Sequence, residues 1–379
     1  MVRPNIPEND LEDIKKLREL VKDDLTPYYD TDFNLLRWLK GHNHNFNEIV
    51  PKLRNHLTFR KSHWNLDTAH LKPRDHPIHA HWQAGLGGLA GKTPHTFINV
   101  EQSGGNDYWG MLYTYPLNEV MRARVYDLEF MLHKVMEHEA ETGEQTSIMY
   151  IMDLDGLHYD KNLISLLNGA LASISAFMSE HYVEMVHSFV LVNVPTFISF
   201  LWNIAKPLLP HRTRNKVIIL DSDWRNEILK LADPEVLPAF WNLPGEDLFK
   251  ADIKRAVPFE KDGYYKDGIP KDSQLLYVKA ASVGSVAVEA EEGQKLSWEF
   301  SADGNFAYGI YFSEDPKLEN VDLMTAVYPR FNKVPGPTYV PLSDFIICPR
   351  TGTYRLWFSN QHAWIHTLKV HYKLETSNE

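Results

Sequence analysis

Two glycine-rich segments near residue 90 have residue types that hold phosphates in other proteins. Residues 85–90 (GLGGLA) fit the loose G-x-G-x-x-A dinucleotide pattern, and residues 91–93 (GKT) resemble the end of a P-loop. The dinucleotide pattern works only between a strand and a helix, but the strand-like segment 96–100 follows here. The P-loop pattern requires a glycine where Leu86 stands. Neither segment therefore predicts a nucleotide site.

Histidines and nucleophiles give no catalytic pattern. His76, His79 and His81 are clustered enough for a metal site, but they lie in a predicted loop whose nearby carboxylate is Asp75. Loop histidines are usually solvated, and we expect no metal there. The sequence has no G-x-S-x-G motif, and its single cysteine, Cys348, lies in a β-rich segment. We therefore predict a protein that is not an enzyme and has no cofactor.

The segment between Pro195 and Pro207 has the clearest chemical meaning. Pro195 suits the start of a helix and Pro207 its end. A helix that is apolar all round is buried in protein or meets lipid, and this one is too short to span a bilayer. Basic residues follow it, which suggests a lid over an apolar ligand, whereas an ordinary core helix explains this segment alone equally simply. The predicted gate residues are Phe197, Phe200, Leu201 and Ile204.

Glu184 and Lys216 flank this lid, each beside a predicted strand edge. Opposite charges beside an apolar cavity can bind a polar headgroup, although each residue alone is more often a surface charge. We therefore expect a headgroup site at these two positions.

The remaining patterns predict an α/β lipid-binding region followed by an all-β one. Residues 1–70 are predicted to form a helical N-terminal lobe, starting at a helix capped by Asn9 or Asp10. Over 71–245, strands at 96–100, 147–152, 188–193 and 217–220 alternate with helices at 117–140 and 163–178, which indicates a mostly parallel sheet.

The pattern changes after residue 245. Residues 246–272 are rich in Gly, Pro, Lys and Asp and are predicted to be a linker. From 273 to 379, apolar residues alternate with polar ones, as at Leu296, Trp298 and Phe300. Short alternating strands separated by turns predict an antiparallel β-sandwich.

Composition restricts the partners. The 379 residues carry a net charge of −11, which argues against nucleic acid as a partner. No apolar run is long enough for a signal peptide or a transmembrane helix. These features predict a soluble, cytoplasmic protein.

Six segments together resemble the CRAL-TRIO lipid-transfer family. They are residues 32–40 (DFNLLRWLK), 151–157 (IMDLDGL), 182–184 (YVE) with 193–195 (NVP), 206–209 (KPLL) and 216–220 (KVIIL), in family order. Residues 273–379 resemble a GOLD domain through WEF at 298–300, GIYF at 309–312 and GTYRL at 352–356. The combination is similar to the subgroup that includes supernatant protein factor, also called tocopherol-associated protein.

The resemblance implies a non-catalytic carrier that holds one hydrophobic ligand beneath a gate helix and exchanges it during transient contact with membranes. In phosphatidylinositol carriers of the family, the headgroup positions match Glu184, Thr213, Lys216, Arg60 and Lys61. The pocket positions implied are Ile148, Tyr150, Met152, Phe189 and Leu191.

The sequence departs from the family pattern at two places. Ile148 and Tyr150 replace small hydroxyl residues, which leaves the headgroup open, and Trp241-Asn242 replaces a Gly-Gly pair, which bears on the hinge of the gate. The expected ligand is therefore phosphatidylinositol, another phospholipid or an isoprenoid such as a tocopherol. The alternative function is a lipid-sensing adaptor, in which the ligand regulates binding of a protein partner through the GOLD domain.

Overall fold

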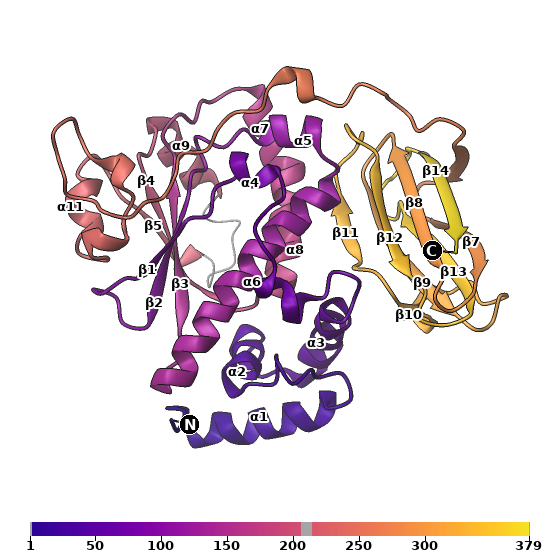
Figure 1. The fold of residues 1–379 in the computed structure, drawn as a ribbon, viewed down its shortest axis with the longest axis horizontal. Helices are drawn as coiled ribbons and strands as arrows, with labels where there is room; N and C mark the ends of the chain where they lie inside the picture. Colours follow the sequence, from indigo (N-terminus) through magenta and orange to yellow (C-terminus); the bar gives the residue numbers. More distant parts are fainter. Residues whose placement is uncertain (1, 206–213, 379) are drawn as a thin grey trace.

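The computed structural model describes residues 2–205 and 214–378, without the side chains of Phe200, Leu201, Ile204 and Ala205. Three N-terminal helices lie beneath a central α/β region, and a β-sandwich lies beside it (Figure 1). This arrangement confirms the predicted fold class of a mostly parallel sheet with a helical lobe plus an antiparallel all-β part.

The N-terminal lobe consists of three helices whose apolar side chains share one core. Leu35, Leu39, Leu53 and Leu57 are fully buried in their shared core. The predicted cap at Asn9 or Asp10 is wrong, because the first helix begins earlier and has Pro7 in the cap position without a side-chain hydrogen bond. The helices are α1 (Glu8–Val21), α2 (Asp32–Gly41) and α3 (Phe46–Arg60).

The central sheet has the order β1-β2-β3-β4-β5. Strands β2 to β5 are parallel, and β1 joins β2 antiparallel at the edge. Four of these strands lie close to their predicted positions, whereas β1 occupies the glycine-rich segment for which no strand was predicted. The strands are β1 (Leu86–Leu89), β2 (Thr96–Glu101), β3 (Ser147–Asp153), β4 (Val186–Val192) and β5 (Val217–Ile219).

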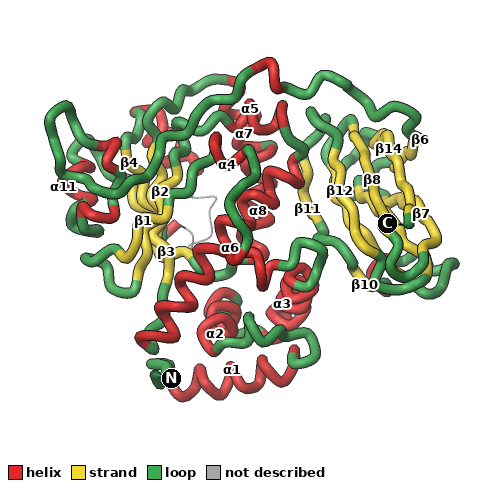
Figure 2. Tube along the Cα trace, viewed as in Figure 1, coloured by secondary structure: helices red, strands yellow, loops and turns green. Residues whose placement is uncertain are grey.

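Helices connect the strands and cover the sheet (Figure 2). The predicted helix at 117–140 is confirmed as α6, but the one at 163–178 is two helices. They meet at Gly169, where an added Cβ would lie 2.8 Å from the Ser165 carbonyl oxygen. The short α4 replaces part of the predicted histidine loop. The helices are α4 (Ile78–His81), α5 (Tyr108–Thr114), α6 (Leu117–Thr142), α7 (Lys161–Asn168), α8 (Ala170–His181), α9 (Thr196–Ala205) and α11 (Trp224–Ile228).

Different segments pack against the two faces of the sheet. On one face, Met149 and Ile151 of β3 and Val190 of β4 pack against residues 220–253. Because side chains alternate along a strand, Tyr150 and Met152 point to the opposite face, toward α6 and α8.

The first part of the predicted linker packs against the sheet. Phe249 is fully buried and Ile253 is 9% exposed, and both belong to the hydrophobic core that contains Met149 and Ile151. The linker prediction was too broad, because these apolar residues hold the chain against the sheet. The following residues cross the molecule to the sandwich as the long loop at the top of Figure 2.

The C-terminal region confirms the predicted sandwich of two antiparallel sheets, ordered β10-β9-β13-β7, with β11 beside β9, and β12-β8-β14-β6. The alternating Leu296, Trp298 and Phe300 all point into its core, each at most 2% exposed. The strands are β6 (Gln274–Val278), β7 (Val283–Ala290), β8 (Lys295–Ala302), β9 (Phe306–Ser313), β10 (Thr325–Ala326), β11 (Phe331–Val334), β12 (Leu342–Ile347), β13 (Gly352–Ser359) and β14 (Leu368–Ser377).

The sandwich packs directly on the helices of the α/β region. The rings of Phe177 in α8 and Phe331 in β11 stack with centroids 5.0 Å apart. Arg122 of α6 forms an ion pair with Asp344 of β12, whose side chain is 3% exposed. The two regions therefore share one hydrophobic core along α8.

Residues Lys161–His181 meet the length and composition criteria for a membrane-spanning helix. In the structure this stretch is the broken pair α7 and α8. Leu163, Leu167 and Ile174 line a cavity, and Phe177 packs on the sandwich. These apolar residues therefore contribute to the cavity wall and to the contact with the sandwich.

Candidate functional site

A cavity of about 610 Å³ lies between the sheet and the helices α6, α7 and α8. This volume is within the usual range of ligand pockets, about 300–1,000 Å³. Its wall is mainly aliphatic and aromatic. The apolar lining comprises Trp82, Leu128, Tyr150, Met152, Leu154, Leu157, Leu163, Leu166, Leu167, Leu171, Ala172, Ile174, Met178, Met185, Val186, Phe189, Leu191 and Ile198.

Four of the five predicted pocket residues line this cavity: Tyr150 and Met152 on β3, and Phe189 and Leu191 on β4. Ile148 does not, and its assignment to the pocket is corrected. It lies on the same face of β3 but nearer the amino end, where the N-terminal lobe and α6 bury it completely. The sequence pattern predicts the correct face of β3, but it does not show where along the strand the cavity ends.

Of the predicted gate residues in α9, only Phe197 has a described side chain. Its neighbour Ile198, which was not among the predicted gate residues, lines the cavity. The ring of Phe197 lies 5.5 Å from that of Tyr159, whose side chain is exposed. The side chains of Phe200, Leu201 and Ile204 lie outside the described residues. Helix α9 thus contributes to the cavity wall, and its role as a gate stays a prediction.

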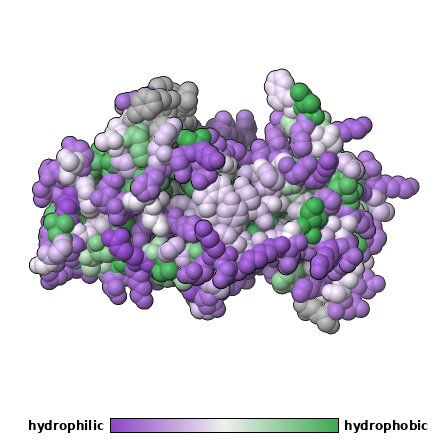
Figure 3. Space-filling view, turned by 90° about the horizontal axis from the view of Figure 1, so that it is seen from above, coloured by the Kyte–Doolittle hydropathy of each residue, from purple (hydrophilic) through white to green (hydrophobic). Residues whose placement is uncertain are grey.

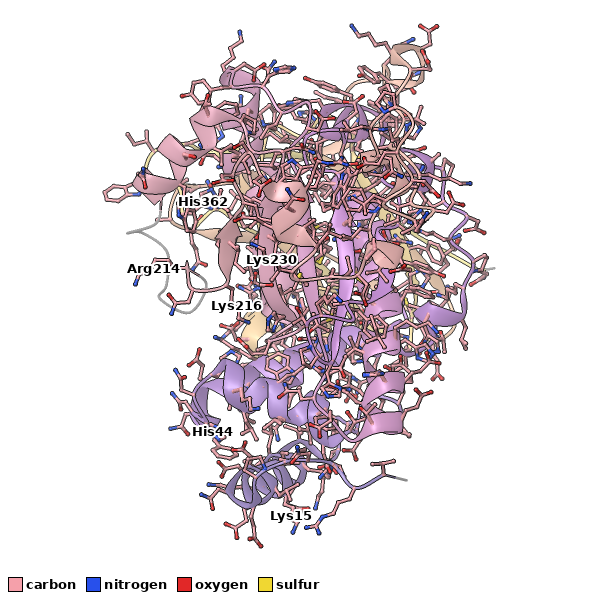
Figure 4. All side chains as sticks on the ribbon, turned by 90° about the vertical axis from the view of Figure 1, so that its left-hand side faces the viewer. Lys15, His44, Arg214, Lys216, Lys230 and His362 are labelled. Carbon is pink, nitrogen blue, oxygen red and sulfur yellow. The ribbon has the colours of Figure 1, made fainter. Side chains whose placement is uncertain are left out.

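Glu184 and Lys216 meet as an ion pair, with Nζ 3.0 Å from Oε2. Glu184 lies just before β4 and Lys216 just before β5, and the amino ends of parallel strands meet at one edge of a sheet. The Lys216 ammonium also donates to the Val186 carbonyl, at 2.7 Å. Figure 4 shows Lys216 above the N-terminal helices. The pair lies beside Met185 and Val186, which line the cavity, but not in the lining itself.

Arg60 does not belong to a headgroup site. Its side chain is completely buried, and its guanidinium donates two hydrogen bonds to Glu129, at 2.9 and 3.0 Å, and one to Asp67, at 2.7 Å. Burial alone would lower the pKa of Arg60, but the charge of Glu129 raises it above its ordinary value. The predicted role in headgroup binding is therefore corrected: Arg60 is a structural cation between α3 and α6.

The last two predicted headgroup residues cannot be assigned a contact. Lys61 is the exposed residue that follows α3. Thr213 lies outside the described residues. Glu184 and Lys216 are thus the two predicted headgroup residues that the structure brings together.

The sequence analysis missed a charged cluster in the cavity wall. Glu101, at the carboxyl end of β2, and Arg124, on α6, form an ion pair of 3.3 Å with both side chains below 10% exposure. The Tyr150 hydroxyl donates to the second oxygen of Glu101, at 3.0 Å. Trp82, Asn106 and Tyr108 donate to its first oxygen, at 2.7, 2.7 and 3.1 Å. Burial and the neighbouring Glu101 charge raise the pKa of Tyr108.

These contacts use the hydrogen-bond acceptors of the Glu101 carboxylate but leave N–H donors of Arg124 for a ligand. A carboxylate accepts about four hydrogen bonds, and Glu101 already has that many. A guanidinium has five N–H donors; Arg124 contacts Glu101 and lies 3.8 Å from Asp127. An arginine in an otherwise apolar helix face was the sequence signal that could have revealed this site.

The two charged positions lie at different heights along the sheet. Glu101 is opposite Met152 in the register, whereas Val186, two residues after Glu184, is opposite Ile148. Four residues of strand separate these levels, or roughly 13 Å. Glu101 and Arg124 therefore form a buried polar part of the cavity wall near the carboxyl ends of the strands. The Glu184–Lys216 ion pair lies at the edge of the cavity near the amino ends.

The remaining motifs serve the fold. His81 hydrogen-bonds the Val257 carbonyl at 2.6 Å, His76 lies 3.4 Å from Glu119, and His79 is buried. Within residues 2–205 and 214–378, no group of three His, Cys, Asp or Glu residues is arranged to hold a metal ion. The glycine-rich 85–90 segment contains an edge strand instead of a phosphate loop.

Three family profiles match consecutive parts of the chain. Residues 95–242 match the CRAL/TRIO domain. Residues 262–379 match the F28H7_8_C:-like, C-terminal domain, and residues 6–69 match a domain of unknown function. The GOLD assignment and the subgroup resemblance are not confirmed by these matches and stay predictions.

Similar proteins include two from Caenorhabditis elegans that match over almost their whole length. CRAL-TRIO domain-containing protein F28H7.8 is 25% identical, with 93% of this chain and 87% of that protein covered. Protein ctg-1 is 22% identical, with 96% and 95% covered.

Shorter and more distant similarities were also found. Phosphatidylinositol/phosphatidylcholine transfer protein SFH4 of Arabidopsis thaliana is 26% identical over 24% of this chain and 15% of that protein. The crystal structure of Sfh5 superposes with a TM-score of 0.48 and 14% identity, covering 67% of this chain and 94% of that one. Residues 95–242, which match the CRAL/TRIO domain, supply most of the sheet and of the cavity wall.

Proposed function

We propose that this protein binds one lipid in the cavity beneath α9 and exchanges it at membranes, acting in the cytoplasm without catalysing a reaction. The observation that carries the proposal is the cavity of about 610 Å³, whose wall is apolar except for a few fixed polar groups. Such a combination favours a mainly hydrocarbon ligand that is oriented by one polar end.

The size of the cavity supports a carrier that works at a membrane. At about 30 Å³ for a water-sized group, a cavity of about 610 Å³ accommodates at least about 20 such groups. Transferring that many methylenes from water is worth roughly 16 kcal/mol, at about 0.8 kcal/mol each. A lipid held this strongly leaves quickly only into another apolar medium, so that exchange requires contact with a bilayer.

The polar groups of the cavity suit lipids of two kinds. An isoprenoid or a lipid with one long chain would place its polar end beside Arg124. Arg124 can donate to a hydroxyl, carbonyl or carboxylate oxygen at its polar end. An anionic phosphoinositide would instead place its headgroup beside Lys216, at the edge of the sheet.

The test is mass spectrometry of lipid that co-purifies with the protein, followed by transfer of the identified lipid between vesicles. The Lys216→Ala variant separates the two ligand classes, because loss of Lys216 weakens binding of an anionic headgroup but not of a neutral isoprenoid. Absence of co-purified lipid, together with no transfer of any tested lipid, would contradict the proposal.

A lipid-sensing adaptor is the second candidate, and the packing of α8 favours it. Ile174 and Met178 of α8 line the cavity, while Ser173 and Phe177 of the same helix contact β11 of the sandwich. A ligand that displaces α8 would therefore change the surface of the sandwich, where a protein partner is proposed to bind. An adaptor binds lipid without moving it between vesicles, which the transfer assay detects.

A further inference from the structure

Two consecutive apolar residues at the tip of a sandwich loop are almost fully exposed. Trp364 is 95% exposed and Ile365 is 91% exposed, more than the other large apolar side chains of the described residues. They lie between β13 and β14, flanked by the exposed His362 and His366. Their exposure differs from that of scattered surface residues because both occupy one projecting tip. Figure 3 shows apolar atoms projecting from the sandwich at its upper right.

The base of this loop is fixed by buried hydrogen bonds. Asn360 is completely buried, and its side-chain amide donates to the carbonyls of Val278, at 3.0 Å, and His366, at 2.8 Å. The backbone of the neighbouring 279–282 turn joins it, since the Ala281 N–H lies 3.1 Å from the Ala363 carbonyl. The tip is therefore presented by a defined scaffold.

The tip lies on the same side of the molecule as Arg214 and Lys216, which precede β5. Figure 4 shows His362, two residues before Trp364, on one side together with Arg214 and Lys216. The exposed Lys279 is in the turn bonded to the tip, and the exposed Lys369 is the second residue of β14, the strand that follows the tip. Cations beside exposed apolar groups suit an anionic membrane surface.

We propose that Trp364 and Ile365 insert into the interfacial layer of an anionic bilayer and provide a membrane contact on the C-terminal sandwich. Tryptophan favours the membrane–water interface, and an adjacent isoleucine can enter the hydrocarbon below it. A convex tip of two residues suits a deformable lipid surface, whereas a stable protein interface buries about 800 Å² on each partner. The inference rests on the proposed function only in requiring a membrane as the site of exchange.

The contact orients the carrier. With the tip in the bilayer, the side bearing Arg214 and Lys216 faces the same membrane, so that the ligand passes between two apolar media. This assigns a lipid-surface function to the sandwich that does not depend on a protein partner.

The experiment measures co-sedimentation of the full-length protein with vesicles of phosphatidylcholine and phosphatidylserine. The Trp364→Ser/Ile365→Ser variant is expected to bind at least tenfold more weakly than the unmodified protein. The control is Leu323→Ser, which changes a leucine that is 71% exposed. Because Leu323 lies near the start of β13, at the end of the sandwich opposite the tip, its substitution is expected to leave binding unchanged.

Lipid content, measured by mass spectrometry of the same preparations, separates this inference from the proposed function. Unchanged lipid content with tenfold weaker vesicle binding supports the tip as a membrane contact. Vesicle binding equal to that of the unmodified protein overturns it, even if the protein carries lipid. Absence of lipid in the unmodified protein contradicts the proposed function and leaves the vesicle result to decide the tip alone.

Discussion

Removing the Arg60 side chain distinguishes a structural role from a ligand-binding one. The Arg60 and Glu129 side chains are both 0% exposed and are joined by two hydrogen bonds. In Arg60→Ala, the Glu129 carboxylate stays buried without its cation. Breaking a buried pair in this way costs about 3–5 kcal/mol. Since domains are stable by only about 5–15 kcal/mol, a large part of the free energy of unfolding should disappear.

Lys216→Ala is the matched control, because it also removes one cation from an ion pair with glutamate. The side chains of Lys216 and Glu184 are 23% and 21% exposed, so that water can solvate the remaining charge. The expected loss of unfolding free energy is about 1 kcal/mol or less. A second variant, Arg60→Met with Glu129→Leu, removes both buried charges and should recover part of the stability lost in Arg60→Ala.

Urea denaturation followed by circular dichroism gives the midpoint for each variant, and the slope shows whether the transition itself has changed. Lipid content is then compared at a temperature where every variant is folded. If Arg60→Ala keeps its stability to within 1 kcal/mol but loses binding of an anionic lipid, Arg60 meets the headgroup and our assignment of it is wrong.

Three further predictions follow from the packing and the buried polar groups. Phe331→Ala should lower the unfolding free energy by about 3–5 kcal/mol, because its ring is buried against Phe177; a loss below 1 kcal/mol in urea denaturation would mean that the sandwich does not support α8. Burial, with a smaller effect of the Arg60 charge, lowers the pKa of His181 to about 3. Between about pH 6.5 and 3 the unfolded chain therefore binds more protons than the folded protein. The free energy of unfolding should fall as the pH falls through that window. His181→Phe should flatten this dependence, and an unchanged slope of midpoint against pH would refute the assignment. Tyr150→Phe removes a hydrogen bond of 3.0 Å to buried Glu101 and should cost about 1–3 kcal/mol while lipid content is retained; loss of lipid at normal stability would assign the hydroxyl to the ligand.

Local patterns predicted the elements well because their causes are local. Leu296, Trp298 and Phe300 alternate because one face of β8 is buried, and the same period-two rule located the sandwich. The buried parallel strands were recognisable as continuous apolar runs for a similar reason. The break between α7 and α8 was missed because a single glycine within an apolar stretch is compatible with a continuous helix.

The candidate site was less predictable because it depends on contacts between distant residues. Arg60 resembles a free cation at a helix end until Glu129, 69 residues away, is placed beside it. The Glu101–Arg124 pair likewise joins the end of a strand to the middle of a helix. Sequence periodicity assigns a residue to a face of an element, but it does not show which charge lies opposite.

Filling the cavity tests the central claim most directly. Ser175 and Ala176 are neighbouring exposed residues of α8, and Ser175 lines the cavity while Ala176 does not. Ser175→Trp places a large ring in the proposed lipid position, whereas Ala176→Trp places the same ring outside it. The measurement is the molar ratio of co-purified lipid to protein by mass spectrometry. We predict a ratio near that of the unmodified protein for Ala176→Trp and a strongly reduced ratio for folded Ser175→Trp; equal ratios in the two variants would contradict a lipid bound in this cavity.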